Sequence, residues 1–451
     1  SPSTEIISYP SGGVLLQGFS SKRLFFKDFF DKIGLEVINL SEGQFKTAFE
    51  NLTLSSMSED DKNQRLNLFS NIWKEITDVI ERNRELNLGS IDYFLNNIDQ
   101  ILEQNGGDWG KASVEYKLID SLVKRGDLEK YFKKEYSKDE NEWKHVDYRN
   151  YFKSKENNDE ENTVAVVNIL GPIIDGYQTS GAASGDNISA LFDKALKNDQ
   201  IKAMVVRVNT PGGSVFASEL IRDALIRVRE KNIPIVTSMG GVAASGGYWV
   251  AASTDYIFAE DLTITGSIGV ASVIFNAEGT FNKIGLNEDG VSSSVFSDTY
   301  RGIYSKRPDE RLINLNKIII QNIYDKFINL VSEGRNISIE DVNKLAKGQV
   351  WIGKDALKFN LIDEIGSLDD AIEKAASLAE IDEYNVKRIY KKKSRFSNFL
   401  PFLINEIGME NEIINKNLDI EYRFEALFTN ISNYNDPKAL YYLCGTCLFI
   451  N

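Results

Sequence analysis

A stretch of sequence that recurs after 251 residues is the feature that most limits how this 451-residue chain can fold. Phe30–Leu35 reads FDKIGL, and Phe281–Leu286 reads FNKIGL. The same offset pairs Arg84 with Arg335, with no gap between the two matches. A collinear set of matches at one spacing predicts two copies of a single structural unit within the chain.

The ends of the two copies set the expected domain boundaries. Leu118–Asp120 matches Leu361–Asp363 at an offset of 243, and Thr4–Ile7 matches Thr254–Ile257 at an offset of 250. The first copy therefore lacks the equivalent of about residues 163 to 253. We expect residues 1–150 to be the remainder of the first repeat domain and residues 151–162 to be a charged linker. Residues 163–381 should form the second repeat domain, and residues 382–451 a C-terminal tail that packs back on the domains.

The second copy contains three apolar runs of strand length, at residues 164–170, 203–208 and 235–239. Between the last two runs, residues 218–229 carry apolar side chains at helical spacing. Strands that alternate with helices in this way predict an α/β fold, with a largely parallel sheet covered by helices. The length of the chain also exceeds what one ordinary core accommodates, which favours two or more domains.

Composition narrows the classes of partner. The formal net charge is −14, and the lysines and arginines are scattered, so nucleic acid is not an expected partner. No apolar run of membrane-spanning length occurs, although the chain begins without methionine, and we expect any membrane anchor upstream of it. The two cysteines, Cys444 and Cys447, suit a small disulfide loop or half a zinc site, but no second pair completes a metal shell.

Two glycine-rich turns follow strands of the second copy, at Asn209–Ser214 and Met239–Trp249. Small residues there let backbone N–H groups approach a ligand closely, so Gly213 and Gly246 are candidate donors of an oxyanion hole. Ser245 precedes Gly246 and is the candidate nucleophile. The alternative is that these glycines only permit tight turns. Neither turn has the spacing of a phosphate-binding loop or a dinucleotide fingerprint.

A nucleophilic serine needs a base, and the chain contains one histidine, His145. It lies beside the charged linker, where a solvated side chain is the ordinary expectation. A neutral lysine is the remaining strong candidate, and such a lysine needs an apolar pocket that lowers its pKa.

Ser238–Trp249, followed by Leu262–Val270, resembles the nucleophile region of the bacterial signal peptide peptidase A (protease IV) family in its long, double-domain form. Arg207–Ser214 is similar to the upstream glycine turn of that family. The resemblance implies that Ser245 is the nucleophile. It also places the lysine base at Lys46, in the string GQFKTAF.

The repeat agrees with this placement, because the second copy carries Ser297 at the position equivalent to Lys46. One Ser–Lys dyad is then shared between the repeats. We also expect the hydroxyl of Ser267 to orient the amine, against the alternative that Ser267 only forms a turn.

The resemblance further implies tandem Clp protease-like, crotonase-like domains, the first truncated at its start, in a homo-oligomer that is expected to be a tetramer. It implies a bacterial inner-membrane protein whose catalytic body faces the periplasm. The expected substrates are remnant signal peptides and other apolar peptides, and neither a cofactor nor a metal is required. A crotonase-like acyl-CoA hydratase or isomerase is one alternative, and an inactive scaffold of the same fold is another.

Overall fold

The structure is a computed structural model that describes residues 5–136, 146–147, 150–151, 161–177, 181–297, 303–390, 440–444 and 446–447. The chain forms two compact units, Ser1–Ser20 with Phe69–Asp159, and Ser21–Leu68 with Glu160–Asn451. Residues 21–68 of the first repeat thus pack with the second repeat. His145 and residues 152–160 of the expected linker lie outside the described residues, so the domain boundary there stays a prediction.

The second unit is built around a mostly parallel sheet whose described strands run in the order β14-β11-β9-β7-β4-β16. Its three central strands, β4 (Thr163–Leu170), β7 (Ile201–Thr210) and β9 (Ile235–Ala244), confirm the three predicted from apolar runs. The remaining strands are β10 (Tyr256–Ala259), β11 (Ile264–Gly266), β14 (Val350–Ile352), β15 (Glu364–Ile365) and β16 (Asn385–Ile389). Among the strand pairs that the structure describes in this sheet, only β11–β14 is antiparallel.

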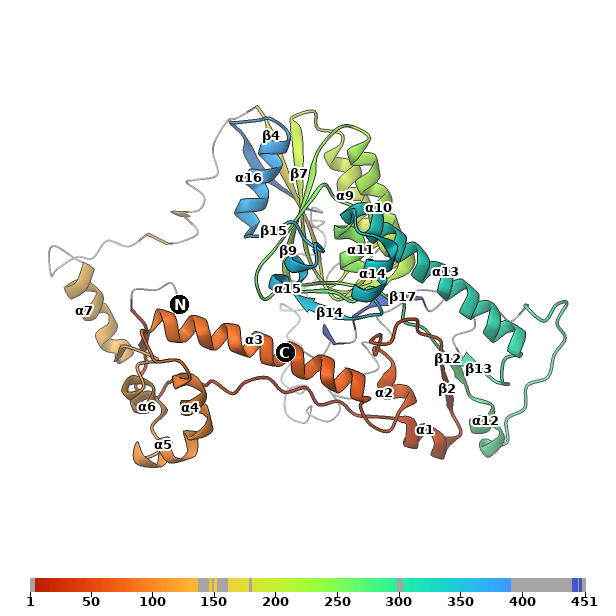
Figure 1. Cartoon of the computed structure of the whole chain (residues 1–451), viewed down its shortest axis with the longest axis horizontal. Helices are drawn as coiled ribbons and strands as arrows, with labels where there is room; N and C mark the ends of the chain where they lie inside the picture. The colour runs from red at the N-terminus through yellow and green to blue at the C-terminus, as the bar shows by residue number, and fades with distance from the viewer. Residues whose placement is uncertain are drawn as a thin grey trace, which may run out of the picture. The chain divides into compact units, whose positions relative to one another are not determined.

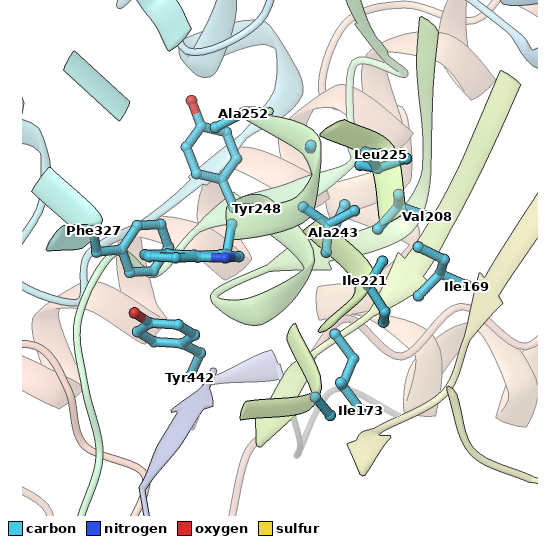
Figure 2. Packing of buried hydrophobic residues seen from close by; sticks show 14 of the residues in the cluster. Ile169, Ile173, Val208, Ile221, Leu225, Ala243, Tyr248, Ala252, Phe327 and Tyr442 are labelled. Carbon is cyan, nitrogen blue, oxygen red and sulfur yellow. The ribbon is translucent and has the colours of Figure 1, made fainter. Parts of the chain in front are cut away.

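Helices cover both faces of this sheet (Figure 1). On one face, α16 (Leu368–Leu378) packs on alternate β4 side chains, including Val164 and Val166. On the other face, β4 presents Val167 and Ile169 to the larger core, part of which Figure 2 shows. Burial on both faces explains why the strands are almost continuously apolar. The helices of the larger core are α9 (Gly185–Ala195), α10 (Val215–Arg229), α11 (Gly246–Ala251), α13 (Glu310–Arg335), α14 (Ile339–Leu345) and α15 (Gly353–Lys358).

The predicted helix at residues 218–229 is confirmed as α10, but it begins at Val215. The earlier start follows from its cap, because the Ser214 hydroxyl accepts a hydrogen bond from the Ala217 N–H at 3.1 Å. The glycine turn therefore leads directly into the helix.

Two small sheets complete the second unit. In one, β2 (Glu36–Asn39) of the first repeat pairs antiparallel with β12 (Val273–Asn276) of the second, and β12 also pairs with β13 (Ile303–Tyr304). Short helices α1 (Lys27–Ile33), α2 (Glu50–Thr53) and α12 (Glu278–Ile284) flank this sheet. The other sheet contains β5 (Ile173–Ile174), β6 (Ala183–Ser184), β8 (Gly212–Ser214) and β17 (Tyr441–Leu443).

The first unit is mainly helical in its described part. Its core contains Ile91, Phe94, Ile101, Ala112 and Leu118. The elements are β1 (Ile7–Ser8), α4 (Ser90–Asn96), α5 (Ile98–Gln104), α6 (Trp109–Glu115), β3 (Ser121–Leu122) and α7 (Arg125–Tyr136), and α3 (Glu59–Asn83) contributes its second half.

The same contacts recur in the two repeats. Arg84 forms a bidentate salt bridge with Asp120, and Arg335 forms the equivalent bidentate salt bridge with Asp363. The N–H of Ile6 donates to Asp120 as the N–H of Ile257 donates to Asp363. Ile6 is therefore equivalent to Ile257, so the predicted offset of 250 at the start of the chain was wrong by one residue. The offset of 251 continues to that point.

Candidate active site

Ser245 lies at the junction between β9 and α11, where the backbone takes an unusual conformation. Its φ angle is 55° and its ψ angle is −112°. A positive φ is uncommon for a residue other than glycine and costs free energy, so the surrounding structure must enforce it. The Ser245 N–H donates to the Gly266 carbonyl at 2.9 Å, and the Ser245 carbonyl accepts from the Trp249 N–H at 2.8 Å. These two bonds fix the direction of the side chain.

Lys46 reaches this junction from the first repeat, and both residues belong to the second compact unit. The Lys46 Nζ lies 2.7 Å from the Ser245 Oγ. The Lys46 side chain is buried, with 4% of its surface exposed, and Ser245 has 0% exposed. Burial lowers the pKa of Lys46 well below its usual 10.5, because the charged form loses its hydration. Burial thus favours the neutral form of the Lys46 amine, and a neutral amine beside the Ser245 hydroxyl can accept a proton.

The loop that carries Lys46 packs directly against the backbone of the second repeat. The Phe45 N–H donates to the Lys347 carbonyl at 2.7 Å. Gly348 packs against this loop with a φ of 81°, and a Cβ there would lie 2.6 Å from the backbone nitrogen of Lys46. A side chain at Gly348 would therefore push the loop away from Ser245.

Ser267 provides two acceptors for the Lys46 amine. The Nζ lies 2.7 Å from the Ser267 carbonyl oxygen and 3.1 Å from its hydroxyl oxygen. Ser267 itself has a φ of 53°, and its N–H donates to the Gln349 carbonyl at 2.7 Å. The structure therefore brings together Lys46, Ser245 and Ser267, as the sequence predicts.

The two candidate oxyanion glycines also lie together. A Cβ added to Gly246 would lie 3.4 Å from the nitrogen of Gly213. Gly213 has a φ of 157°, and a Cβ there would lie 1.9 Å from the Ile173 carbonyl oxygen. Only glycine fits at this position of β8, so its backbone N–H is held close to the turn that carries Ser245.

A buried charge network beside Lys46 is missed by the sequence analysis. Asp61, with 0% exposed, accepts hydrogen bonds from the Thr47 hydroxyl at 2.8 Å, from Arg23 at 2.7 Å and from Arg65 at 2.9 Å. Arg23 also donates to the Thr47 carbonyl at 3.2 Å and to Glu50 at 2.6 Å. The network holds the residue next to Lys46. The helical spacing of Asp61 and Arg65 is its only local signal.

Within the described ranges, no group of three or more histidine, cysteine, aspartate or glutamate side chains is arranged to hold a metal ion. Cys444 and Cys447 form a disulfide with each other.

Among the residues that the structure covers, no helix has both the length and the apolar character needed to cross a bilayer.

Comparisons with known proteins agree on one family. The model of peptidase family S49 matches residues 1–136 and 227–382, so Lys46 falls in one matched segment and Ser245 in the other. Protease 4 of Salmonella typhi is 32% identical over 446 residues, which is 97% of this chain and 72% of that protein. Protease 4 of Haemophilus influenzae is 31% identical, over 98% of this chain and 74% of that protein. The chloroplastic serine protease SPPA of Arabidopsis thaliana is 28% identical, over 90% of this chain and 59% of that protein.

Proposed function

Because this chain belongs to peptidase family S49, we propose that it is a serine endopeptidase with a Ser–Lys dyad, in which Ser245 is the nucleophile and Lys46 the general base. The observation that carries the proposal is the distance of 2.7 Å between the Lys46 Nζ and the Ser245 Oγ in a buried pair. A neutral amine accepts the serine proton directly, and burial favours that neutral amine because it lowers the pKa of Lys46.

In the acylation step, the Ser245 Oγ bonds to the carbonyl carbon of the substrate while its proton moves to the Lys46 Nζ. The negative charge that develops on the carbonyl oxygen is stabilised by the N–H groups of Gly213 and Gly246. When the intermediate collapses, the carbon–nitrogen bond breaks. The ammonium of Lys46 then returns the proton to the leaving amine.

In the deacylation step, a water molecule replaces the departed amine. Lys46 takes one proton from this water as its oxygen bonds to the acyl carbon. The ester bond to Ser245 then breaks, and the Ser245 oxygen recovers its proton from Lys46. The acid product leaves, and the neutral amine and the free hydroxyl are both restored.

Ser267 acts in both steps as an orienting residue. A neutral amine has two N–H groups and one lone pair. If the two N–H groups donate to the Ser267 carbonyl and hydroxyl oxygens, the lone pair is left for the Ser245 O–H. The contact geometry supports this arrangement.

The proposed substrates are remnant signal peptides and other apolar peptides, cleaved at the periplasmic side of a bacterial inner membrane. The contacts that recur between the repeats support two related units, and the proposal takes these units to be Clp protease-like, crotonase-like domains. Assembly into a tetramer, with the membrane anchor upstream of this chain, completes the proposal.

The test compares Ser245→Ala with Ser297→Ala, a change at an exposed serine of the second repeat. We expect Ser245→Ala to abolish peptide hydrolysis and labelling by a serine-directed phosphonate, while thermal unfolding is unchanged. Ser297→Ala should keep both activities. Full hydrolysis by a folded Ser245→Ala variant would contradict the proposal, and an acyl-CoA hydratase would show no dependence on either serine.

A further inference from the structure

The glycine turn that carries the Gly213 N–H is held at both ends by side-chain hydrogen bonds. On its N-terminal side, the Gly212 N–H donates to the Thr210 hydroxyl at 3.0 Å. On its C-terminal side, the Ser214 carbonyl accepts from the Ser218 hydroxyl at 2.7 Å, and Ser214 has 0% of its surface exposed. Because Ser214 directly follows Gly213, the direction of the Gly213 N–H depends on where Ser214 is held.

The side chain of Asp175 holds Ser214 from outside the turn. The Asp175 Oδ1 accepts from the Ser214 hydroxyl at 2.6 Å, although the two residues are 39 positions apart in the sequence. The same hydroxyl oxygen accepts from the Ala217 N–H at 3.1 Å, at the start of α10. A hydrogen bond to a carboxylate is charge-assisted, and is therefore stronger than one between neutral groups. Ser214 is thus fixed to a carboxylate and to a helix start at once.

Asp175 is itself anchored on both sides along the chain. The strand β5 directly precedes it and pairs in parallel with β8, where Ile173 lies opposite Gly213. The Ile173 side chain is buried in the larger core, as Figure 2 shows. After Asp175, the Gly176 carbonyl accepts a hydrogen bond from the Ser184 hydroxyl. The carboxylate therefore provides a fixed point for the glycine turn.

Capping of α10 alone does not require this carboxylate, because the Ser214 oxygen already accepts the Ala217 N–H. Burial raises the pKa of Asp175, and the hydrogen bonds from the Ser214 hydroxyl and the Ala217 N–H act against this rise. A neutral acceptor would avoid the free-energy cost of desolvating a charge. What Asp175 adds is the orientation of the Ser214 hydroxyl and, through it, of the Ser214 backbone.

We propose that Asp175 is a positioning residue of the oxyanion hole: its carboxylate fixes Ser214, and Ser214 fixes the direction of the adjacent Gly213 N–H. This inference rests on the proposed peptidase function. An oxyanion donor stabilises the transition state only when it is aimed at the oxygen that becomes negative. A displaced Gly213 N–H should therefore lower the rate of the chemical step without weakening the binding of the substrate.

The test compares Asp175→Ala with Asp175→Asn in the full chain, since the amide oxygen of asparagine still accepts the Ser214 hydroxyl. We expect Asp175→Ala to lower kcat for an apolar peptide by about 10- to 100-fold and to change KM by less than about twofold, which is part of the effect of losing one oxyanion donor. Asp175→Asn should retain kcat within about fivefold, because it loses only the charge of the acceptor. Asp186→Ala removes a nearby carboxylate from the first turn of α9, and this matched control should behave as the wild type.

Two inhibitors separate the oxyanion hole from the general shape of the groove. With an apolar tripeptide aldehyde, the Ser245 Oγ bonds to the aldehyde carbon, its proton moves to Lys46, and the negative oxygen lies in the oxyanion hole. The alcohol with the same side chains has no carbonyl and forms no such adduct. In Asp175→Ala, the Ki of the aldehyde should rise by about 10- to 100-fold, as kcat falls, and the Ki of the alcohol should stay unchanged.

If Asp175→Ala does not fold, Asp175→Glu should show the same pattern, because it keeps the charge and moves the carboxylate oxygens by one methylene group. Wild-type kcat and aldehyde inhibition in the folded variant would overturn the role of Asp175. Equal weakening of the aldehyde and the alcohol would also contradict it, since the carboxylate would then shape the groove. The same holds if Asp175→Asn is impaired as much as Asp175→Ala. If the wild type neither cleaves the peptide nor binds the aldehyde at Ser245, the peptidase proposal itself fails.

Discussion

The loop that carries Lys46 and the equivalent loop of the second repeat have opposite surroundings. In the first repeat, residues 46–52 are all buried. In the second repeat, the equivalent of Lys46 is Ser297, which is exposed, as is the neighbouring Phe296. The two loops therefore share a position in the repeat but not an environment.

Other equivalent positions have stayed alike. Gly34 and Gly285 both end a short helix in the left-handed conformation, with φ angles of 81° and 76°. Arg84 and Arg335 both hold an aspartate at the end of the repeat. The comparison teaches that the repeat conserves the contacts that build the fold, whereas the residues of the candidate dyad are divided between the copies.

The largest expected effect comes from Lys46→Met, which keeps the length of the side chain and removes the amine. We expect kcat/KM for an apolar peptide to fall by about 10⁴- to 10⁶-fold, the scale of losing one member of a catalytic unit. Ser297→Lys, which places a lysine in the equivalent exposed loop, should neither change wild-type activity nor rescue Lys46→Met. Rescue would mean that the environment of the two loops is not what separates them.

The pH dependence of the wild type tests whether the buried Lys46 has a lowered pKa and acts as the base. The pKa of Lys46 is lowered in the folded chain, so the unfolded chain binds more protons in the window between the lowered pKa and 10.5. Stability therefore rises with pH through that window. Lys46→Met should raise the unfolding temperature most at the low-pH end and progressively less toward pH 10.5. The kcat/KM of the wild type should rise with pH through one ionisation, and a flat profile would require another base.

An intermediate effect is expected from Asp61→Asn. This change weakens the hold on Thr47 and leaves Arg23 and Arg65 with less compensated charge, so the free energy of unfolding should fall by about 3 kcal/mol. Displacement of the adjacent Lys46 should reduce kcat by about 10- to 100-fold.

The control for Asp61→Asn is Asp120→Asn, which disrupts the ion pair with Arg84 in the other compact unit. It should lower the unfolding temperature without changing kcat. If both variants changed kcat equally, the effect would reflect general destabilisation rather than the placement of Lys46.

The parts of the site that sequence reasoning can predict have local signals. Gly213, Ser245 and Gly246 lie in glycine turns directly after apolar strands, and these short-range patterns indicate both the turn and its chemistry. Lys46 has no such signal of its own. Its prediction depended on the repeat and on the family resemblance, which together identify one lysine among many.

The parts that could not be predicted depend on long-range packing. The pairing of Tyr442 with Gly213 joins segments more than 200 residues apart, and a short apolar strand carries no information about its partner. The charge network around Asp61 likewise depends on Arg23, which lies far from it in sequence. The packing of residues 21–68 with the second repeat follows from such contacts rather than from the repeat boundaries.

The smallest expected effect is that of Ser267→Ala, which separates the orientation of the amine from its presence. The change removes the hydroxyl acceptor at 3.1 Å and leaves the carbonyl acceptor at 2.7 Å, so the lone pair of Lys46 is held less firmly toward Ser245. Losing one hydrogen bond of ordinary strength should lower kcat by roughly 3- to 10-fold. The ammonium form also loses an acceptor, so the pKa of Lys46 should fall and the rising limb of the pH profile should move to lower pH. Ser253→Ala is the matched control, because Ser253 is buried and its hydroxyl donates to the Trp249 carbonyl without contacting Lys46. A pH profile that moves in Ser267→Ala and not in Ser253→Ala would support the orienting role, and a profile that moves in neither would leave Ser267 with a structural role in its turn.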